Sequence, residues 1–160
     1  MDGTTMGTKP NNYKDYYADR LKAAQEYQDF LCEQLHEKGI VLQNMTSQKY
    51  QHRKENMLGM EIKFDDMIKK TGRMYIETDE KAHPDNPYYV PSGIYREDNS
   101  WLYAIGDYKE LFVFGKKMLR RLDKHNPDWL YRPLKSKPTS RGFCIPKDKA
   151  IEIAENYIIF

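Results

Sequence analysis

A short stretch of alternating residues carries the clearest chemical signal in the sequence. In residues 59–65 apolar and charged side chains alternate, a pattern typical of a half-buried β-strand. Since successive side chains of a strand point to opposite faces, Glu61, Lys63 and Asp65 are expected on one polar face. A carboxylate and a lysine two residues apart suit metal-assisted phosphodiester hydrolysis. The carboxylate binds Mg²⁺, and the ammonium group orients water or offsets charge on the phosphate.

One carboxylate is seldom enough to hold Mg²⁺ or Mn²⁺, so a second acidic side chain should converge on Glu61. Glu55, just before the strand, is one candidate ligand, and Glu77 on the next predicted strand is the other; Asp65 is a secondary candidate. The same charges could also form a cross-strand arrangement on an ordinary half-exposed strand. The triplet alone leaves both interpretations open.

A basic segment follows in the second half of the chain. Residues 109–149 contain 12 Lys and Arg against 4 Asp and Glu, whereas the remaining residues are net acidic. At helical spacing the side chains of Lys117, Arg120, Arg121 and Lys124 share one face. Such a face can contact DNA phosphates without reading the base sequence, although a simply solvated helix would look the same.

These residues are positioned by a mixed set of predicted elements in a chain of 160 residues. Residues 1–12 are expected to be a flexible lead-in, and residues 13–160 a single domain of the α/β (α+β) class, with a mixed β-sheet flanked by helices. The pattern predicts the following elements: a long helix over 13–38, a short strand over 40–42, an antiparallel hairpin from strands 60–64 and 74–77, central strands over 101–105 and 111–114, a basic helix over 116–124, and a last helix from 145 to about 158.

Composition excludes several classes of protein. The two cysteines, Cys32 and Cys144, cannot form a disulfide scaffold or a four-cysteine zinc site. No apolar run approaches the ~20 residues of a membrane span, and no P-loop pattern is present. We therefore expect a cytoplasmic protein of a reducing compartment, with no membrane partner.

Several motifs in residues 55–114 occur in a specific order: the Glu61–Lys63 triplet, Thr71-Gly72 before a strand ending in Glu77, Ser92-Gly93-Ile94, and an aromatic strand from Trp101. This order resembles the PD-(D/E)XK nuclease superfamily, especially its small phage and bacterial members. The resemblance implies a restriction-endonuclease-like core and a magnesium-dependent hydrolase, a DNA-binding endonuclease or exonuclease. It makes Glu61 a metal ligand and Lys63 the catalytic lysine.

The chain departs from that family at two positions. The acidic residue that normally precedes the triplet has Glu55 as its nearest counterpart, and Arg73 stands where these members usually have Asn. The alternative is therefore a catalytically inactive nuclease-like module that binds nucleic acid or a protein partner. Because cutting both strands of DNA often requires two active sites, a homodimer is a further expectation.

Overall fold

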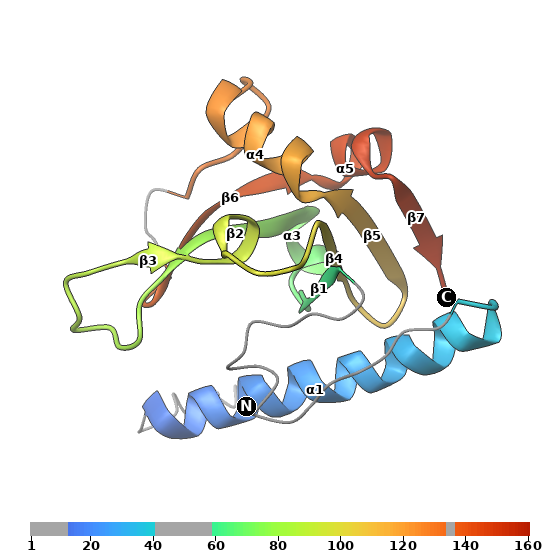
Figure 1. Cartoon of the computed structure of the whole chain (residues 1–160), viewed down its shortest axis with the longest axis horizontal. Helices are drawn as coiled ribbons and strands as arrows, with labels where there is room; N and C mark the ends of the chain where they lie inside the picture. Colours follow the sequence, from blue (N-terminus) through green and yellow to red (C-terminus); the bar gives the residue numbers. More distant parts are fainter. Residues whose placement is uncertain (1–12, 41–58, 134–136) are drawn as a thin grey trace, which may run out of the picture.

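The chain forms two β-sheets with helices on opposite sides of them (Figure 1). The computed structural model describes residues 13–40, 59–133 and 137–160, so the predicted lead-in, most of the predicted strand 40–42 and Glu55 lie outside the described residues. The elements are α1 (Tyr13–Glu37), β1 (Met60–Phe64), α3 (Ile68–Thr71), β2 (Arg73–Glu80), β3 (Val90–Pro91), the short 3-10 helix η1 (Gly93–Tyr95), β4 (Leu102–Gly106), β5 (Glu110–Gly115), α4 (Lys116–His125), β6 (Ser140–Pro146), α5 (Lys147–Ile153) and β7 (Asn156–Ile159). The predicted α+β class, with a mixed sheet flanked by helices, is confirmed.

The larger sheet has the strand order β1-β4-β5-β7. Strands β1 and β4 are parallel, and the other neighbours in this sheet are antiparallel. The central position of β4 and β5 confirms the prediction from their continuous apolar sequence, because a strand covered on both faces needs apolar side chains on both. The turn between them is closed by Asp107, whose carboxylate accepts hydrogen bonds from the backbone N–H groups of Lys109 and Glu110.

The predicted hairpin of strands 60–64 and 74–77 is wrong. Strand β1 pairs with β4, whereas β2 belongs to a second sheet with the order β3-β2-β6. The chain leaves β1 through Asp65 and the single turn of α3, which ends at Gly72 in the left-handed conformation. This helical turn redirects the chain, so β2 cannot fold back along β1 as a hairpin partner.

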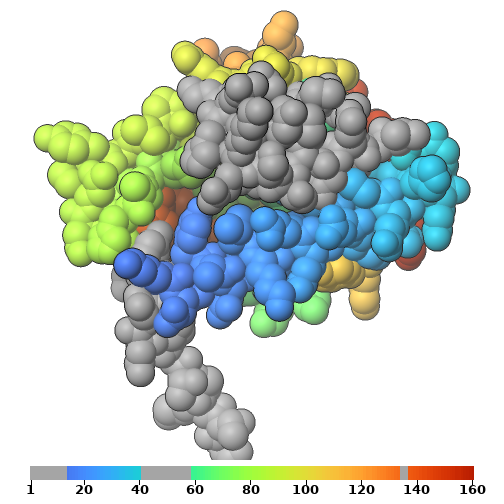
Figure 2. Space-filling view, turned by 60° about the horizontal axis from the view of Figure 1, so that its bottom comes forward, coloured from blue at the N-terminus to red at the C-terminus, as the bar shows by residue number. Residues whose placement is uncertain are grey.

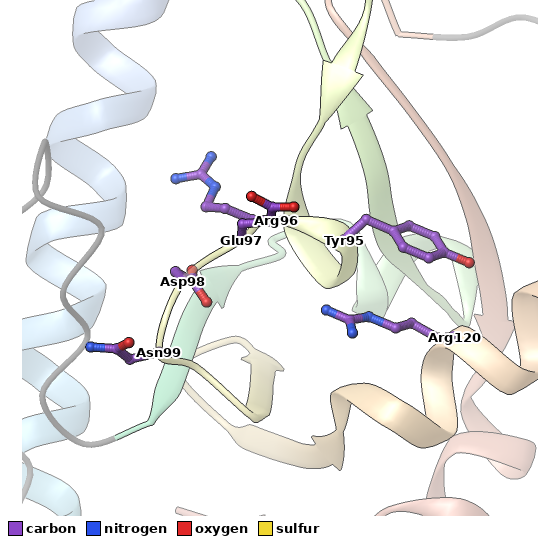
Figure 3. A pocket seen from close by; sticks show the side chains of 6 residues that line it. All are labelled: Tyr95, Arg96, Glu97, Asp98, Asn99 and Arg120. Carbon is purple, nitrogen blue, oxygen red and sulfur yellow. The ribbon is translucent and has the colours of Figure 1, made fainter.

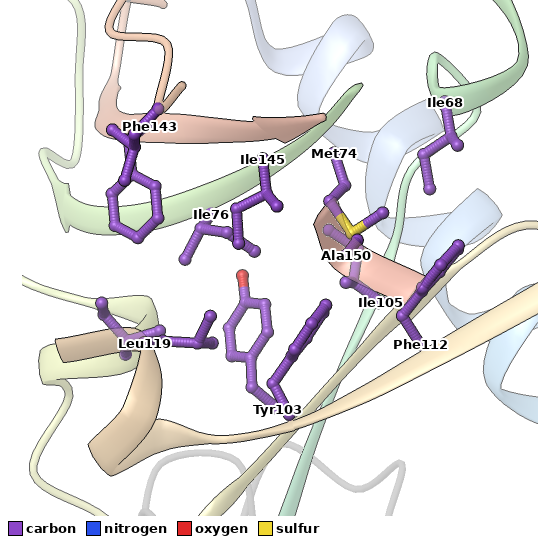
Figure 4. Packing of buried hydrophobic residues seen from close by; sticks show 13 residues of the cluster. Ile68, Met74, Ile76, Tyr103, Ile105, Phe112, Leu119, Phe143, Ile145 and Ala150 are labelled. Carbon is purple, nitrogen blue, oxygen red and sulfur yellow. The ribbon is translucent and has the colours of Figure 1, made fainter. Parts of the chain in front are cut away.

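Two apolar clusters cover the two faces of the larger sheet. One face packs against β2, β6, α4 and α5, and Figure 4 shows Ile76 and Phe143 facing Tyr103 across this core. The other face packs against α1. Alternation along β4 divides its side chains between the clusters, with Tyr103 and Ile105 in the first and Ala104 in the second.

Helix α1 confirms the predicted helix over 13–38, but only its C-terminal half is buried. Leu31 and Leu35 of the predicted apolar stripe are buried, whereas Tyr17 and Leu21 are 59% and 41% exposed. A helix of 25 residues is about 37 Å long, roughly twice the length of the five-residue strands beneath it. The sheet therefore covers one half of α1, which lies across the surface in Figure 2.

The C-terminal region also differs from the prediction. The last helix, α5, ends at Ile153, and Tyr157 and Ile158 lie in β7, which pairs with β5. Residues 140–146, including the predicted helix start at Ile145, form β6. Both differences have one cause: β5 and β2 each offer an unpaired edge, and the backbone hydrogen bonds gained there outweigh the weak local helix pattern.

Because one half of α1 is buried and the other exposed, the same substitution should reduce stability by different amounts in the two halves. Replacing Leu31 by Ala should lower the free energy of unfolding by about 2–5 kcal/mol, because it leaves a cavity against the sheet. Leu21→Ala, the matched change on the exposed half, should cost less than about 0.5 kcal/mol. Urea denaturation of both variants measures the difference, and equal effects would contradict this placement of α1.

Candidate active site

Three of the charged side chains singled out in the sequence meet at the edge of the larger sheet. The Lys63 ammonium lies 3.0 Å from Glu61 Oε1 and 3.7 Å from Glu77 Oε1. Glu61 and Lys63 come from β1, whereas Glu77 comes from β2 of the second sheet. The side chain of Lys63 is 32% exposed, against 12% for Glu61 and 18% for Glu77. The cluster is therefore open to solvent mainly at the lysine.

Two serine hydroxyl groups fix the Glu77 carboxylate. Ser92 Oγ donates a hydrogen bond to Oε1 and Ser140 Oγ donates one to Oε2, each at 2.8 Å. Ser92 reaches this position because Gly93 has a φ of 49° and packs directly on the Glu77 backbone, where any Cβ would collide with the carbonyl oxygen. The Ser-Gly-Ile motif thus orients a carboxylate of the candidate site.

A buried lysine that the sequence analysis did not assign to the site lies behind Glu61. Lys116, the first residue of α4, is only 2% exposed. Its ammonium lies 2.8 Å from Glu61 Oε2 and 3.3 Å from Asp98 Oδ1. A signal was present in the sequence, because Lys116 precedes the buried Leu119 by three residues and so shares the core-facing side of the helix.

The charges of the cluster support one another. Burial disfavours the charged form of Lys63, but the carboxylates of Glu61 and Glu77 outweigh it and raise the lysine pKa. Burial also disfavours the carboxylate of Glu77, but Lys63 and the two serine hydroxyl groups lower its pKa overall. At neutral pH the site therefore holds the Lys63 ammonium group beside the ionised carboxylate of Glu77.

The other predicted ligands are not part of this cluster in the described structure. Both carboxylate oxygens of Asp65 accept backbone hydrogen bonds, from the N–H groups of Met67 at 3.0 Å and Tyr75 at 3.1 Å. Asp65 therefore ties the end of β1 to β2. Glu55 lies outside the described residues, and its role as a ligand stays a prediction.

The cluster supplies some of the oxygen ligands that a hard divalent cation needs. Glu61 and Glu77 supply carboxylate oxygens, and Mg²⁺ is commonly held by one or two carboxylates together with water. Glu61 Oε2 is buried and has no hydrogen-bond partner within the described residues, although Lys116 stands beside it. Within residues 13–40, 59–133 and 137–160, no three His, Cys, Asp or Glu side chains gather at one point. The described part of the chain thus offers two carboxylate ligands.

The basic helix is confirmed as α4, but its predicted face is divided. Lys117, Arg121 and Lys124 are exposed, whereas Arg120 donates a hydrogen bond to the Ile94 carbonyl oxygen at 2.6 Å. Arg120 lines an open depression with Tyr95 and residues 96–99 (Figure 3). Asp98, which pairs with Lys116, also lines it. This depression is therefore connected to Glu61 through Lys116.

No protein-family model, no curated protein and no solved structure matches this chain. No helix in the described part of the chain is long and apolar enough to cross a membrane. Function is therefore inferred from the geometry of the described residues.

The buried position of Lys116 predicts a large loss of stability when its charge is removed. Lys116→Met should lower the free energy of unfolding by about 3–5 kcal/mol, because it removes the buried cation that pairs with Asp98 and leaves Glu61 with Lys63 alone. The exposed neighbour supplies the control, since Lys117→Met should change stability by less than about 0.5 kcal/mol. Chemical denaturation measures both, and a Lys116→Met protein as stable as the control would contradict the buried pairing.

Glu77 predicts a loss of stability in acid. Its pKa in the folded protein is below the ordinary value of 4.5, so its contribution is present above pH 4.5 and is lost as the pH falls through the folded pKa. The melting temperature, followed from pH 6 to pH 3, should fall less for Glu77→Gln than for the wild type. Glu97→Gln, an exposed control, should follow the wild type; identical declines in all three proteins would refute the assignment.

Proposed function

We propose that this protein is a metal-dependent nuclease that hydrolyses phosphodiester bonds of DNA at the cluster of Glu61, Lys63 and Glu77. The observation that carries the proposal is the convergence of two carboxylates, from two different sheets, on the ammonium group of one partly exposed lysine. Each carboxylate is also held from behind, Glu61 by Lys116 and Glu77 by two serine hydroxyl groups. Groups fixed in this way can act on a substrate without first reorganising.

Glu61 and Glu77 are the residues that would hold Mg²⁺ or Mn²⁺, with Glu55 as a third candidate. The bound ion would activate water and neutralise charge on the phosphate.

Lys63 has an electrostatic role in this proposal. Since its pKa is raised, it stays protonated at neutral pH and cannot take a proton from water. Its side chain is the most exposed of the three in the cluster and can reach a phosphate oxygen. Charge that develops on the phosphate in the transition state would be stabilised there more strongly than in the bound substrate.

The surroundings are compatible with a DNA substrate. The exposed cations Lys117, Arg121 and Lys124 of α4 would contact phosphates, and these contacts would position the duplex without reading its sequence. A restriction-endonuclease-like relationship and a homodimer that cuts both strands belong to the same proposal. The role of Ser92 and Gly93 at Glu77 supports it, since it gives the Ser-Gly-Ile motif a function at the site.

One observation favours the alternative of an inactive nucleic-acid-binding or protein-binding module. Lys63 and Lys116 already compensate Glu61, so the cluster also makes sense as an ion-pair network that joins two sheets. Metal binding separates the two candidates, because only the nuclease requires it.

Replacing Lys63 tests the proposal on activity and on metal binding. Lys63→Ala should lower the rate of DNA cleavage by about a hundredfold or more, since it removes one preorganised donor. It should also lower the free energy of unfolding by about 1–3 kcal/mol, because the partly buried carboxylates of Glu61 and Glu77 each lose one of their partners. In this variant Mg²⁺ should raise the melting temperature more than in the wild type, because the cation replaces the missing charge between Glu61 and Glu77.

The matched control is Lys70→Ala, which removes an exposed lysine from α3 and should preserve both cleavage and the response to Mg²⁺. Plasmid and linear DNA assayed with Mg²⁺ or Mn²⁺ report the activity, and calorimetry reports the metal. Glu61→Gln should lose affinity for the metal as well as activity. Cleavage that survives Lys63→Ala, or a melting temperature that no divalent cation changes, would overturn the proposal.

A further inference from the structure

A second group of side chains, outside the site, lies along the ribbon formed by β2 and β6. Two tyrosine rings on one side of this ribbon each have a cation over them. Lys137 Nζ lies 3.9 Å from the centre of the Tyr75 ring, and the Arg73 guanidinium lies 4.4 Å from that of Tyr131. We call these four residues the tyrosine–cation face. A third pair, with the Arg141 guanidinium 3.7 Å from the centre of the Tyr89 ring, lies outside this face, because Arg141 is on the other side of β6 from Ser140.

The register of the ribbon separates this face from the core. Met74 and Ile76 of β2 are fully buried in the core between the sheets, so the alternate residues Arg73 and Tyr75 lie on the opposite side of the strand. Tyr131 joins them there through its bridge with Cys144, the residue paired with Tyr75. Arg73 is exposed, and Tyr131 is 42% exposed.

The face runs along β2 toward the candidate site. Arg73, Tyr75 and Glu77 are successive alternate residues of β2 and lie on the same side of it. Four steps along a strand correspond to roughly 13 Å. The rings and cations therefore follow a path that suits a short piece of an extended strand.

One serine connects this face to the candidate active site. Ser140 Oγ lies 3.0 Å from the Tyr75 hydroxyl group and donates a hydrogen bond to Glu77 Oε2 at 2.8 Å. Lys137, over the Tyr75 ring, also lies within the electrostatic reach of Glu77. A base placed on Tyr75 would therefore have its phosphate close to Glu77 and Lys63.

We propose that the tyrosine–cation face binds a single strand of nucleic acid and leads it into the cluster of Glu61, Lys63 and Glu77. The inference rests on the proposed function, because it specifies an unpaired strand as the part of the substrate that reaches the site. Tyrosine rings offer stacking surfaces to any base, and the cations beside them match the negative charge of the backbone. Arg73 and Lys137 take the phosphates, while Tyr75 and Tyr131 take the bases.

The test measures binding in the Lys63→Ala background and without a divalent cation, so that the probe is not cut. The probe is a fluorescent 12-nucleotide oligothymidine, followed by anisotropy over a range of salt concentrations. Arg73→Ala with Lys137→Ala should weaken binding and reduce the salt slope by about 1.4, since each phosphate contact on a single strand contributes about 0.7. Lys38→Ala with Lys109→Ala removes two exposed cations elsewhere and should leave the slope nearly unchanged.

The role of the rings is tested separately from charge. Tyr75→Leu and Tyr131→Leu should each weaken binding of oligothymidine at least fivefold. Neither should affect an abasic oligonucleotide of the same length and charge. Tyr75→Phe keeps the ring and should keep the affinity, which distinguishes loss of stacking from loss of the hydrogen bond to Ser140. Melting curves confirm that each variant is folded.

Equal losses for the abasic and the normal probe would overturn the proposal, as would an unchanged salt slope in the variant that lacks Arg73 and Lys137. A duplex of the same length that binds more tightly than the single strand and is equally weakened by the tyrosine variants would also overturn it. Because binding is measured without cleavage, these failures are distinguishable from failure of the proposed nuclease. A wild-type protein that binds as described but cuts no DNA would refute only the nuclease.

Discussion

The ion pairs of Lys63 connect the two halves of this structure. Lys63 stands on the edge strand of the larger sheet, and its ammonium group contacts a carboxylate of its own strand and one from the second sheet. A lysine can satisfy both carboxylates only if β2 crosses beside β1, so the packing of the two sheets and the charge of the site constrain each other. The apolar core between the sheets fixes that crossing from the inside. Functional chemistry and sheet packing therefore share one set of residues.

The excess of positive charge in residues 109–149 serves ion pairs within the protein as well as a proposed contact with a polyanion. Several cations of the basic segment pair with acidic groups of the same fold: the buried Lys116 with Glu61 and Asp98, and the more exposed Arg132 with Asp123 and Lys147 with Glu110. Only part of the positive charge is therefore available to a polyanion. On α4 that part is Lys117, Arg121 and Lys124. A count of charges along a sequence consequently overstates the surface that is available to a polyanion.

The candidate site is rigid because each of its groups has a second partner. Glu77 is held by hydroxyl groups from the loop before η1 and from β6, and Glu61 by a buried lysine at the start of α4. Asp65, which looked like a further ligand, joins β1 to β2 through backbone hydrogen bonds. The acidic residues of this region thus divide into two carboxylates available to a cation and others that position them.

The sequence by itself determined the elements with strong local signals. The long helix, the alternating strand 60–64, the two central strands and the basic helix follow from periodicity, because each buries one face or both. It also placed Glu61 and Lys63 on one face, since strand alternation is a local property. The pairing of the strands and the partner of Lys116 did not follow from local patterns. Whether β1 joins β2 or β4, whether residues 156–159 extend a helix or complete a sheet, and whether Lys116 faces water or Glu61 all depend on which edges and cavities remain when the other elements have packed. Those choices are made by backbone hydrogen bonds and buried charges between residues far apart in the chain, and only the tertiary structure decided them.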